Sequence, residues 1–121
     1  MVVGGNFNQQ DSPGNAAFVP APRNPFSKGV IAATTPPHGY RSAVAYDPTT
    51  RTWITVGPNG TDISTDDGRN WHPLKPNPKD ADTQPDEDQH WNALSLPFVV
   101  GPHGRIGLLR PSALQPQPSK P

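Results

Sequence analysis

The chain has 121 residues, and its ten basic and ten acidic side chains give a formal net charge of zero. Without a net field to attract polyanions or anionic lipid, we predict no nucleic-acid partner, and no window approaches the roughly 20 apolar residues of a membrane-spanning helix. The sequence contains no cysteine, which excludes disulfides, thiolate zinc sites and cysteine nucleophiles.

Proline and glycine shape the expected fold. The chain has 18 prolines and 11 glycines, and only 31% of its residues are hydrophobic. Because helix interiors and central strands exclude proline, ordered structure is expected only in proline-poor windows. These windows are 30–33, 39–46, 51–56, 61–71 and 91–109. None has a helical period, so we predict an all-β fold.

Residues 1–38 are predicted to form a partial unit with an irregular loop rich in proline and glycine. The apolar run that ends at Gly4 and Gly5 looks like the second strand of a repeat whose first strand is missing. Residues 16–19 could form one further strand, and residues 30–33 another.

Residues 39–74 are predicted to form a complete unit. Four short β-prone runs, 40–46, 52–56, 61–64 and 70–74, are separated by turn sequences. One turn contains Asp47 and Pro48, and another is Gly57-Pro58-Asn59-Gly60. This pattern predicts an antiparallel meander of four strands.

The third turn of this unit has the pattern Ser-x-Asp-x-Gly-x-x-Trp, formed by Ser64, Asp66, Gly68 and Trp71. We expect the Asp66 carboxylate to accept hydrogen bonds from backbone N–H groups two and three residues further on. Gly68 should supply a positive φ without steric cost. Trp71 is expected to lie back over the turn.

The remaining residues form three segments. Residues 75–90 are polar and predicted to be a disordered insertion; their acidic run lacks the ligand spacing of an EF-hand. Residues 91–110 are predicted to be a partial final unit, and 111–121 a disordered proline-rich tail. Gly101 repeats Gly57 at an offset of 44 residues within the matching segments 56–60 and 100–104, and residues 91–95 are aligned with 40–44. A period near 40 to 50 residues with four strands per unit is typical of a propeller blade.

The Ser-x-Asp-x-Gly-x-x-Trp turn and the repeat resemble those of BNR/Asp-box β-propellers, which include sialidases and proteins similar to photosystem II assembly factors. The resemblance implies a partial β-propeller of about two to three four-stranded antiparallel blades. Propellers close with four to eight blades, which protects their sheet edges. We therefore expect either a truncated reading frame, which we favour, or a piece that assembles with other copies or another chain. Self-association through exposed blade edges is one such assembly.

The resemblance also implies a candidate ligand face, where innermost strands begin. It would comprise Tyr40, Arg41, Asn59, Trp91, Asn92 and His103. Arg41 beside an aromatic side chain could clamp a carboxylate or stack on a sugar. The alternative is that these residues only cap strands and line a channel.

No catalytic residue, cofactor or metal site is predicted. A sialidase needs an arginine cluster and a tyrosine nucleophile backed by a glutamate, and the only glutamate is Glu87. Asp47, Asp62, Asp66 and Asp67 are interpreted as turn residues. His38, His72, His90 and His103 lack the spacing of zinc ligands.

We therefore expect a non-catalytic scaffold that contacts a protein or a glycan. The alternative is the remnant of a sialidase-like glycoside hydrolase whose catalytic residues lie in blades outside this sequence. Localisation stays open. The first residues have no signal-peptide pattern, and the resemblance favours an exported parent protein.

Overall fold

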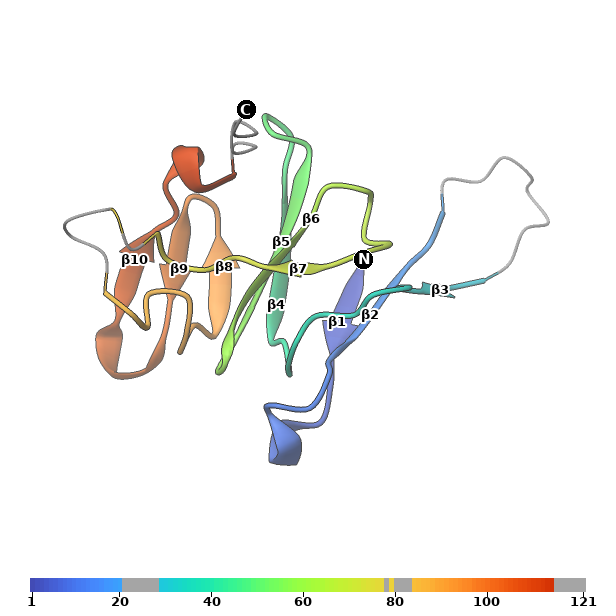
Figure 1. Ribbon diagram of the computed structural model, residues 1–121, viewed down its shortest axis with the longest axis horizontal. Helices are drawn as coiled ribbons and strands as arrows, with labels where there is room; N and C mark the ends of the chain where they lie inside the picture. The colour runs from blue at the N-terminus through green and yellow to red at the C-terminus, as the bar shows by residue number, and fades with distance from the viewer. Residues whose placement is uncertain (21–28, 78, 80–83, 115–121) are drawn as a thin grey trace.

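The computed structural model describes residues 1–20, 29–77, 79 and 84–114. Within these residues the regular structure consists of ten strands in three antiparallel sheets, three short 3-10 helices and no α-helix (Figure 1). The all-β prediction is confirmed. Part of the predicted insertion and most of the predicted tail, residues 78, 80–83 and 115–121, lie outside the described residues.

The first sheet has the order β1-β2-β3, formed by Val2–Gly4, Asn15–Phe18 and Ile31–Ala32. The 3-10 helix η1, Phe7–Gln9, lies in the connection between β1 and β2. Ala16 and Phe18 point to one side of this sheet and are buried. The Phe18 ring packs under the guanidinium of Arg69, 5.0 Å from its centroid, so the inner side of the first sheet contacts the turn that follows β6.

The second sheet has the order β4-β5-β6-β7, formed by Ala43–Asp47, Thr52–Gly57, Gly60–Ser64 and His72–Pro73. Its chain order is the four-stranded meander expected for residues 39–74. Asp47 closes the first turn by accepting hydrogen bonds from the Thr49 amide at 3.1 Å and the Thr50 hydroxyl at 2.7 Å. The strands β5 and β6, the two central strands of this sheet, are the most buried strands of the described residues.

The third sheet has the order β10-β9-β8, formed by Ile106–Leu108, Phe98–Val100 and Ala93–Ser95. The 3-10 helix η2, Pro102–Gly104, connects β9 to β10, and η3, Pro111–Leu114, follows β10. Residues 111–114 thus have regular structure where a disordered tail was predicted.

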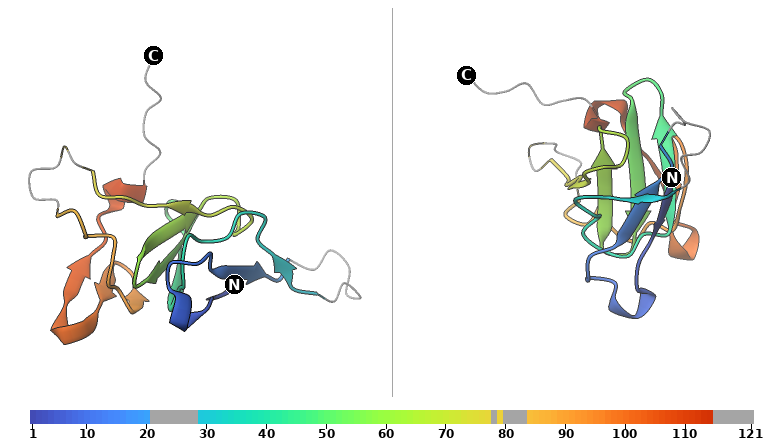
Figure 2. Two further views of the ribbon diagram at one scale, coloured as in Figure 1. Left: turned by 60° about the horizontal axis from the view of Figure 1, so that its bottom comes forward. Right: turned by 90° about the vertical axis from the view of Figure 1, so that its right-hand side faces the viewer.

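The three sheets lie side by side, with the four-stranded sheet in the middle (Figures 1 and 2). Strand β4 contacts β1 on one side and β8 on the other. Between the second and third sheets, Val56, Trp91 and Val99 form a buried apolar cluster, with Ala43 and Leu94 packed against it. This cluster fixes the third sheet against the second.

The strand registers correct the alignment of the two repeats. Ala43 pairs with Val56, and Ala93 pairs with Val100. The preceding residues repeat the same bond: the Ser42 amide donates to Val56 O at 2.9 Å, and the Asn92 amide donates to Val100 O at 2.8 Å. Trp91 therefore takes the place of Arg41, not of Tyr40 as predicted. A slip of one residue matters because it turns every side chain of a strand to the other face.

Candidate functional site

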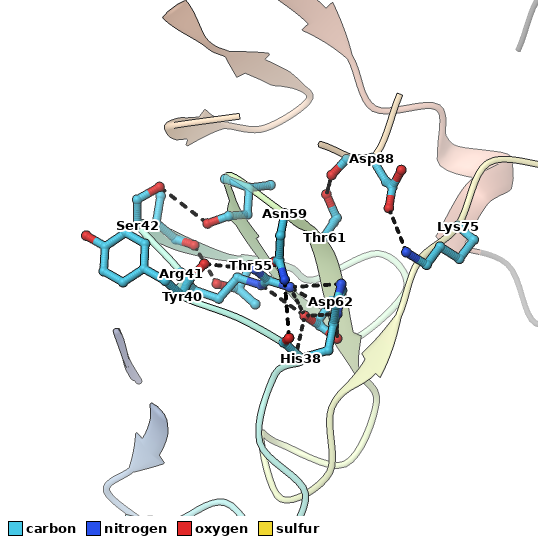
Figure 3. A network of polar contacts seen from close by, with 12 residues as sticks. His38, Tyr40, Arg41, Ser42, Thr55, Asn59, Thr61, Asp62, Lys75 and Asp88 are labelled. Atoms are coloured by element: carbon cyan, nitrogen blue, oxygen red, sulfur yellow. Dashed lines mark hydrogen bonds and ion pairs between the residues drawn. The ribbon is translucent and has the colours of Figure 1, made fainter. Parts of the chain in front are cut away.

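The candidate site is centred on a buried ion pair between Arg41 and Asp62 (Figure 3). Arg41 lies just ahead of β4, and Asp62 lies in the middle of β6. Nε and Nη2 of Arg41 donate to the same carboxylate oxygen of Asp62, at 2.9 and 2.5 Å. Both side chains are fully shielded from solvent. An ion pair in a water-free position needs its remaining donors and acceptors satisfied as well, or the desolvation cost exceeds the attraction.

His38 and Asn59 complete that hydrogen bonding. The Asp62 carboxylate also accepts from the His38 amide at 3.2 Å and contacts Nδ1 of the His38 ring at 2.9 Å. Nη1 of Arg41 donates to Asn59 Oδ1 at 2.6 Å and to the carbonyl of Tyr40 at 2.8 Å. Each nitrogen of the Arg41 guanidinium therefore has a partner inside the protein. We call His38, Arg41, Asn59 and Asp62 the Arg41 cluster.

The cluster corrects two predictions. Arg41 was expected on a ligand face, but it is 1% exposed and its donors are occupied, so it cannot clamp a ligand carboxylate in this structure. Burial lowers the pKa of the Arg41 guanidinium, and the Asp62 charge and hydrogen bond oppose that shift. Asp62 was interpreted as a turn residue, but it lies within a strand and neutralises this buried cation.

In the third sheet the position of Arg41 is filled by Trp91. Asp62 pairs with Thr55, and the corresponding pair of the third sheet is Gly107 with Val99. A Cβ at Gly107 would lie 2.7 Å from Cη2 of Trp91, so only glycine leaves room for the indole. The guanidinium of Arg105 lies over the same ring, 4.2 Å from its centroid. The second sheet thus has the Arg41–Asp62 ion pair at the positions where the third sheet has the indole of Trp91 packed against Gly107.

Residues 87 and 88 attach the end of the polar segment to both sheets. Nε1 of Trp91 donates to Glu87 O at 2.7 Å, and the Thr61 hydroxyl donates to Asp88 O at 2.8 Å. The Asp88 carboxylate is buried and meets Nζ of Lys75 at 3.2 Å through one oxygen. Its other oxygen has no hydrogen-bond partner among the described residues.

The other predicted face residues fall into two groups. Asn59 belongs to the Arg41 cluster and Tyr40 adjoins it. Both are half-buried, and the Tyr40 ring is edge-on to Phe7 at 5.6 Å between centroids. Asn92 and His103 are exposed. The carbonyl of Asn92 accepts from the Ser42 hydroxyl at 2.8 Å, which ties the starts of β4 and β8 together. The side chains left open to solvent are thus those of Asn92 and His103.

The turn after β6 has a dense set of short-range hydrogen bonds. Asp66 Oδ1 accepts from the Asn70 amide at 2.9 Å and from the Ser64 hydroxyl at 2.8 Å. Ser64 Oγ accepts from the Gly68 amide at 2.9 Å. The Asp66 carboxylate was predicted to accept from the amides two and three residues further on, but it accepts from the amide of Asn70, four residues on, because the Ser64 hydroxyl accepts from the amide of Gly68.

The glycine and the tryptophan of this turn lie as expected. Gly68 has the positive φ that was predicted, 86°. The indole of Trp71 is buried and donates through Nε1 to the carbonyl of Gly68 at 3.1 Å, so it covers the turn. The amide of Trp71 donates to Thr35 O at 2.9 Å, which links the turn to the segment that enters the second sheet.

These contacts support structural roles for the acidic side chains. Asp62 neutralises the charge of Arg41, Asp88 forms an ion pair with Lys75, and Asp47 and Asp66 close turns. Hydrolysis by paired carboxylates requires one acid and one base free to reach a substrate. Among the described residues no group of three or more histidine or acidic side chains is placed to hold a metal ion.

No protein-family model, curated protein or solved structure matches the chain. Over the described ranges, the structure contains no helix with the length and apolar character needed to cross a bilayer.

Proposed function

We propose that the chain is part of a BNR-type β-propeller that acts as a non-catalytic interaction scaffold for a protein or a glycan. The observation that carries the proposal is the repeated construction of the second and third sheets. Ser42 and Asn92 make the same backbone bond to Val56 and Val100, and the residue before each is a buried side chain, Arg41 or Trp91. A propeller consists of consecutive sheets with the same strand pairing and the same buried positions.

The scaffold role is supported by where the charged groups are. Arg41, the only cation among the predicted face residues, is neutralised by Asp62, and the buried carboxylate of Asp88 is paired with Lys75. Of the predicted face residues, the two that are exposed are the polar loop residues Asn92 and His103. Such side chains can donate and accept hydrogen bonds to a sugar or a peptide without taking part in bond cleavage.

The experiment is a binding screen with immobilised glycans, sialylated and unsialylated, followed by titration of each glycan that binds. The double variant Asn92→Ala/His103→Ala should lose at least about tenfold in affinity, as expected from removing two polar contacts. His72→Ala is the matched control because His72 is also exposed but lies on β7, outside the predicted face. Equal binding by all three proteins would refute the placement of the ligand face.

The same samples test the catalytic alternative. A fluorogenic sialoside should show no release of fluorophore above the background of heat-denatured protein. Hydrolysis that depends on folded protein would overturn the non-catalytic proposal and favour the glycoside hydrolase remnant. Within the described ranges no contact favours that alternative. The guanidinium donors of Arg41 are already hydrogen-bonded, and the carboxylate of Glu87 accepts a hydrogen bond from the amide of Gln84 at 3.0 Å.

A further inference from the structure

The third sheet has an apolar face that no described residue covers. Strand pairing places Val100 opposite Ile106 and Phe98 opposite Leu108. Because side chains alternate along a strand, all four point to the same side, away from the buried Val99. Their exposed fractions lie between 40 and 71%. We call these four residues the outer face of the third sheet.

The second sheet shows what such a face packs against. Its corresponding pairs are Val56 with Thr61 and Ile54 with Ile63. Here Val56 is buried under Trp91 and Val99 of the third sheet. The outer face of the third sheet therefore corresponds to the Val56 side of the second sheet, and that side is covered by the third sheet.

The first sheet has a free face of the complementary kind. Val2 pairs with Ala17, and Ala17 pairs with Ala32, so these three side chains share one side, opposite the buried Ala16 and Phe18. Val19 and Val30 lie just beyond the ends of β2 and β3. The exposed fractions of Val2, Val19 and Val30 lie between 63 and 68%. We call these five residues the outer face of the first sheet.

The registers make Val2 the counterpart of Val99. In each sheet the last paired residues before the connection between these two strands are Gly4 with Asn15, Gly57 with Gly60, and Gly101 bonded to Arg105. We call each of these the closing pair. Val2 lies two residues before this closing position in its strand, as Val99 does in β9. In the third sheet that residue packs onto the Val56 side of the preceding sheet. The outer face of the first sheet thus corresponds to the Val99 side of the third sheet. The outer face of the third sheet corresponds to the Val56 side of the second sheet, on which Val99 packs.

We propose that the occupant of the third-sheet outer face is the first-sheet outer face of a second copy of this chain. The contact is head-to-tail, because two different faces meet, and it places Val2 of one copy against Val100 of the other. It repeats, between copies, the packing that Val99 makes on Val56 within one chain. It uses none of the loop residues proposed to contact a ligand, so either proposal can fail without the other.

The test is the molar mass of the full chain in solution, measured by sedimentation or light scattering over a roughly hundredfold range of concentration, with Kd taken from the curve. The wild type should associate as concentration rises. Ile106→Asp alters one face and Val2→Asp the other, and each alone should weaken association at least about tenfold. Phe7→Asp is the control because Phe7 is similarly exposed but lies on neither face. Circular dichroism of every variant checks that it is folded.

Mixing the two face variants separates head-to-tail contact from other modes. Ile106→Asp keeps the first-sheet face and Val2→Asp keeps the third-sheet face, so the mixture should form a one-to-one complex that neither forms alone. A wild type that stays monomeric throughout overturns the proposal. So does association that survives Val2→Asp but not Ile106→Asp, because this shows that two third-sheet faces pair with each other. Association that is lost equally in Phe7→Asp overturns it as well.

Discussion

Replacing Asp62 by alanine is expected to destabilise the protein more than any other single removal of a carboxylate. The variant leaves the Arg41 charge buried with no counter-charge in the cluster. Asp62 accepts from Nε and Nη2 of Arg41 and from the amide of His38, and it contacts the His38 ring. All of these contacts are lost together, whereas Arg41 retains its bonds to Asn59 and to the carbonyl of Tyr40 and the contact of its Nη2 with the His38 ring.

The magnitude follows from the burial of the pair. Both side chains are fully shielded, so water cannot replace the lost carboxylate. Removing one partner of a buried ion pair costs about 3–5 kcal/mol. With a urea m-value of about 2 kcal/mol/M, the unfolding midpoint should fall by roughly 2 M. Arg41→Met with Asp62→Ala should be more stable than Asp62→Ala alone, because no uncompensated charge remains in the cluster.

The assay is equilibrium urea unfolding, monitored by tryptophan fluorescence and circular dichroism. Asp47→Ala is the matched control, since Asp47 is a turn carboxylate on the same sheet with its partners near the surface, and its midpoint should change little. The reasoning is refuted if Asp62→Ala shifts the midpoint no more than this control. It is also refuted if the double variant proves less stable than Asp62→Ala.

Two further predictions concern the turn after β6 and the third sheet. Burial raises the pKa of Asp66, but hydrogen bonds from Asn70 and its other turn partners outweigh it and lower the pKa to about 2 from the unfolded value of 3.8. The resulting stability, about 1 kcal/mol after allowance for solvent screening, is present above pH 3.8 and is lost as the pH falls through the folded pKa. Asp66→Ala should cost about 1–3 kcal/mol near neutral pH and leave ligand affinity unchanged. It should also remove this acid dependence of the urea midpoint. Gly107→Ala should cost about 1–3 kcal/mol because its Cβ would overlap Trp91, whereas Gly4→Ala, whose added Cβ would meet open space, should change the melting temperature far less. Equal losses for both glycines would contradict this.

The sequence predicts the local features well because they depend on neighbours in the chain. The β-branched residues of 52–56 predict the central strand, and the glycine at 68 predicts a positive φ. Asp47 is the last residue of β4, and its side chain closes the following turn as interpreted, because its partners lie two and three residues away.

The candidate site depends on contacts that no local pattern contains. Arg41 and Asp62 are 21 residues apart, and their pairing arises only when β4 and β6 lie on either side of β5. One signal could have indicated it: Asp62 lies between Thr61 and Ile63 in a strand-forming run, and a charge within a buried strand requires a partner. The one-residue error in the repeat arose because Trp91 resembles Tyr40 in type, whereas the strand ladder matches it with Arg41.

The exchange of an ion pair for an indole on glycine bears on how such repeats can diverge. To convert the second-sheet arrangement into that of the third, Arg41 must become an aromatic residue and Asp62 a glycine. Either step alone passes through a form with an unpaired buried charge or a steric overlap. In relatives of this chain we therefore expect the two positions to change together. Repeats in which two packed residues must be exchanged together can differ in sequence at the positions where their packing is most similar.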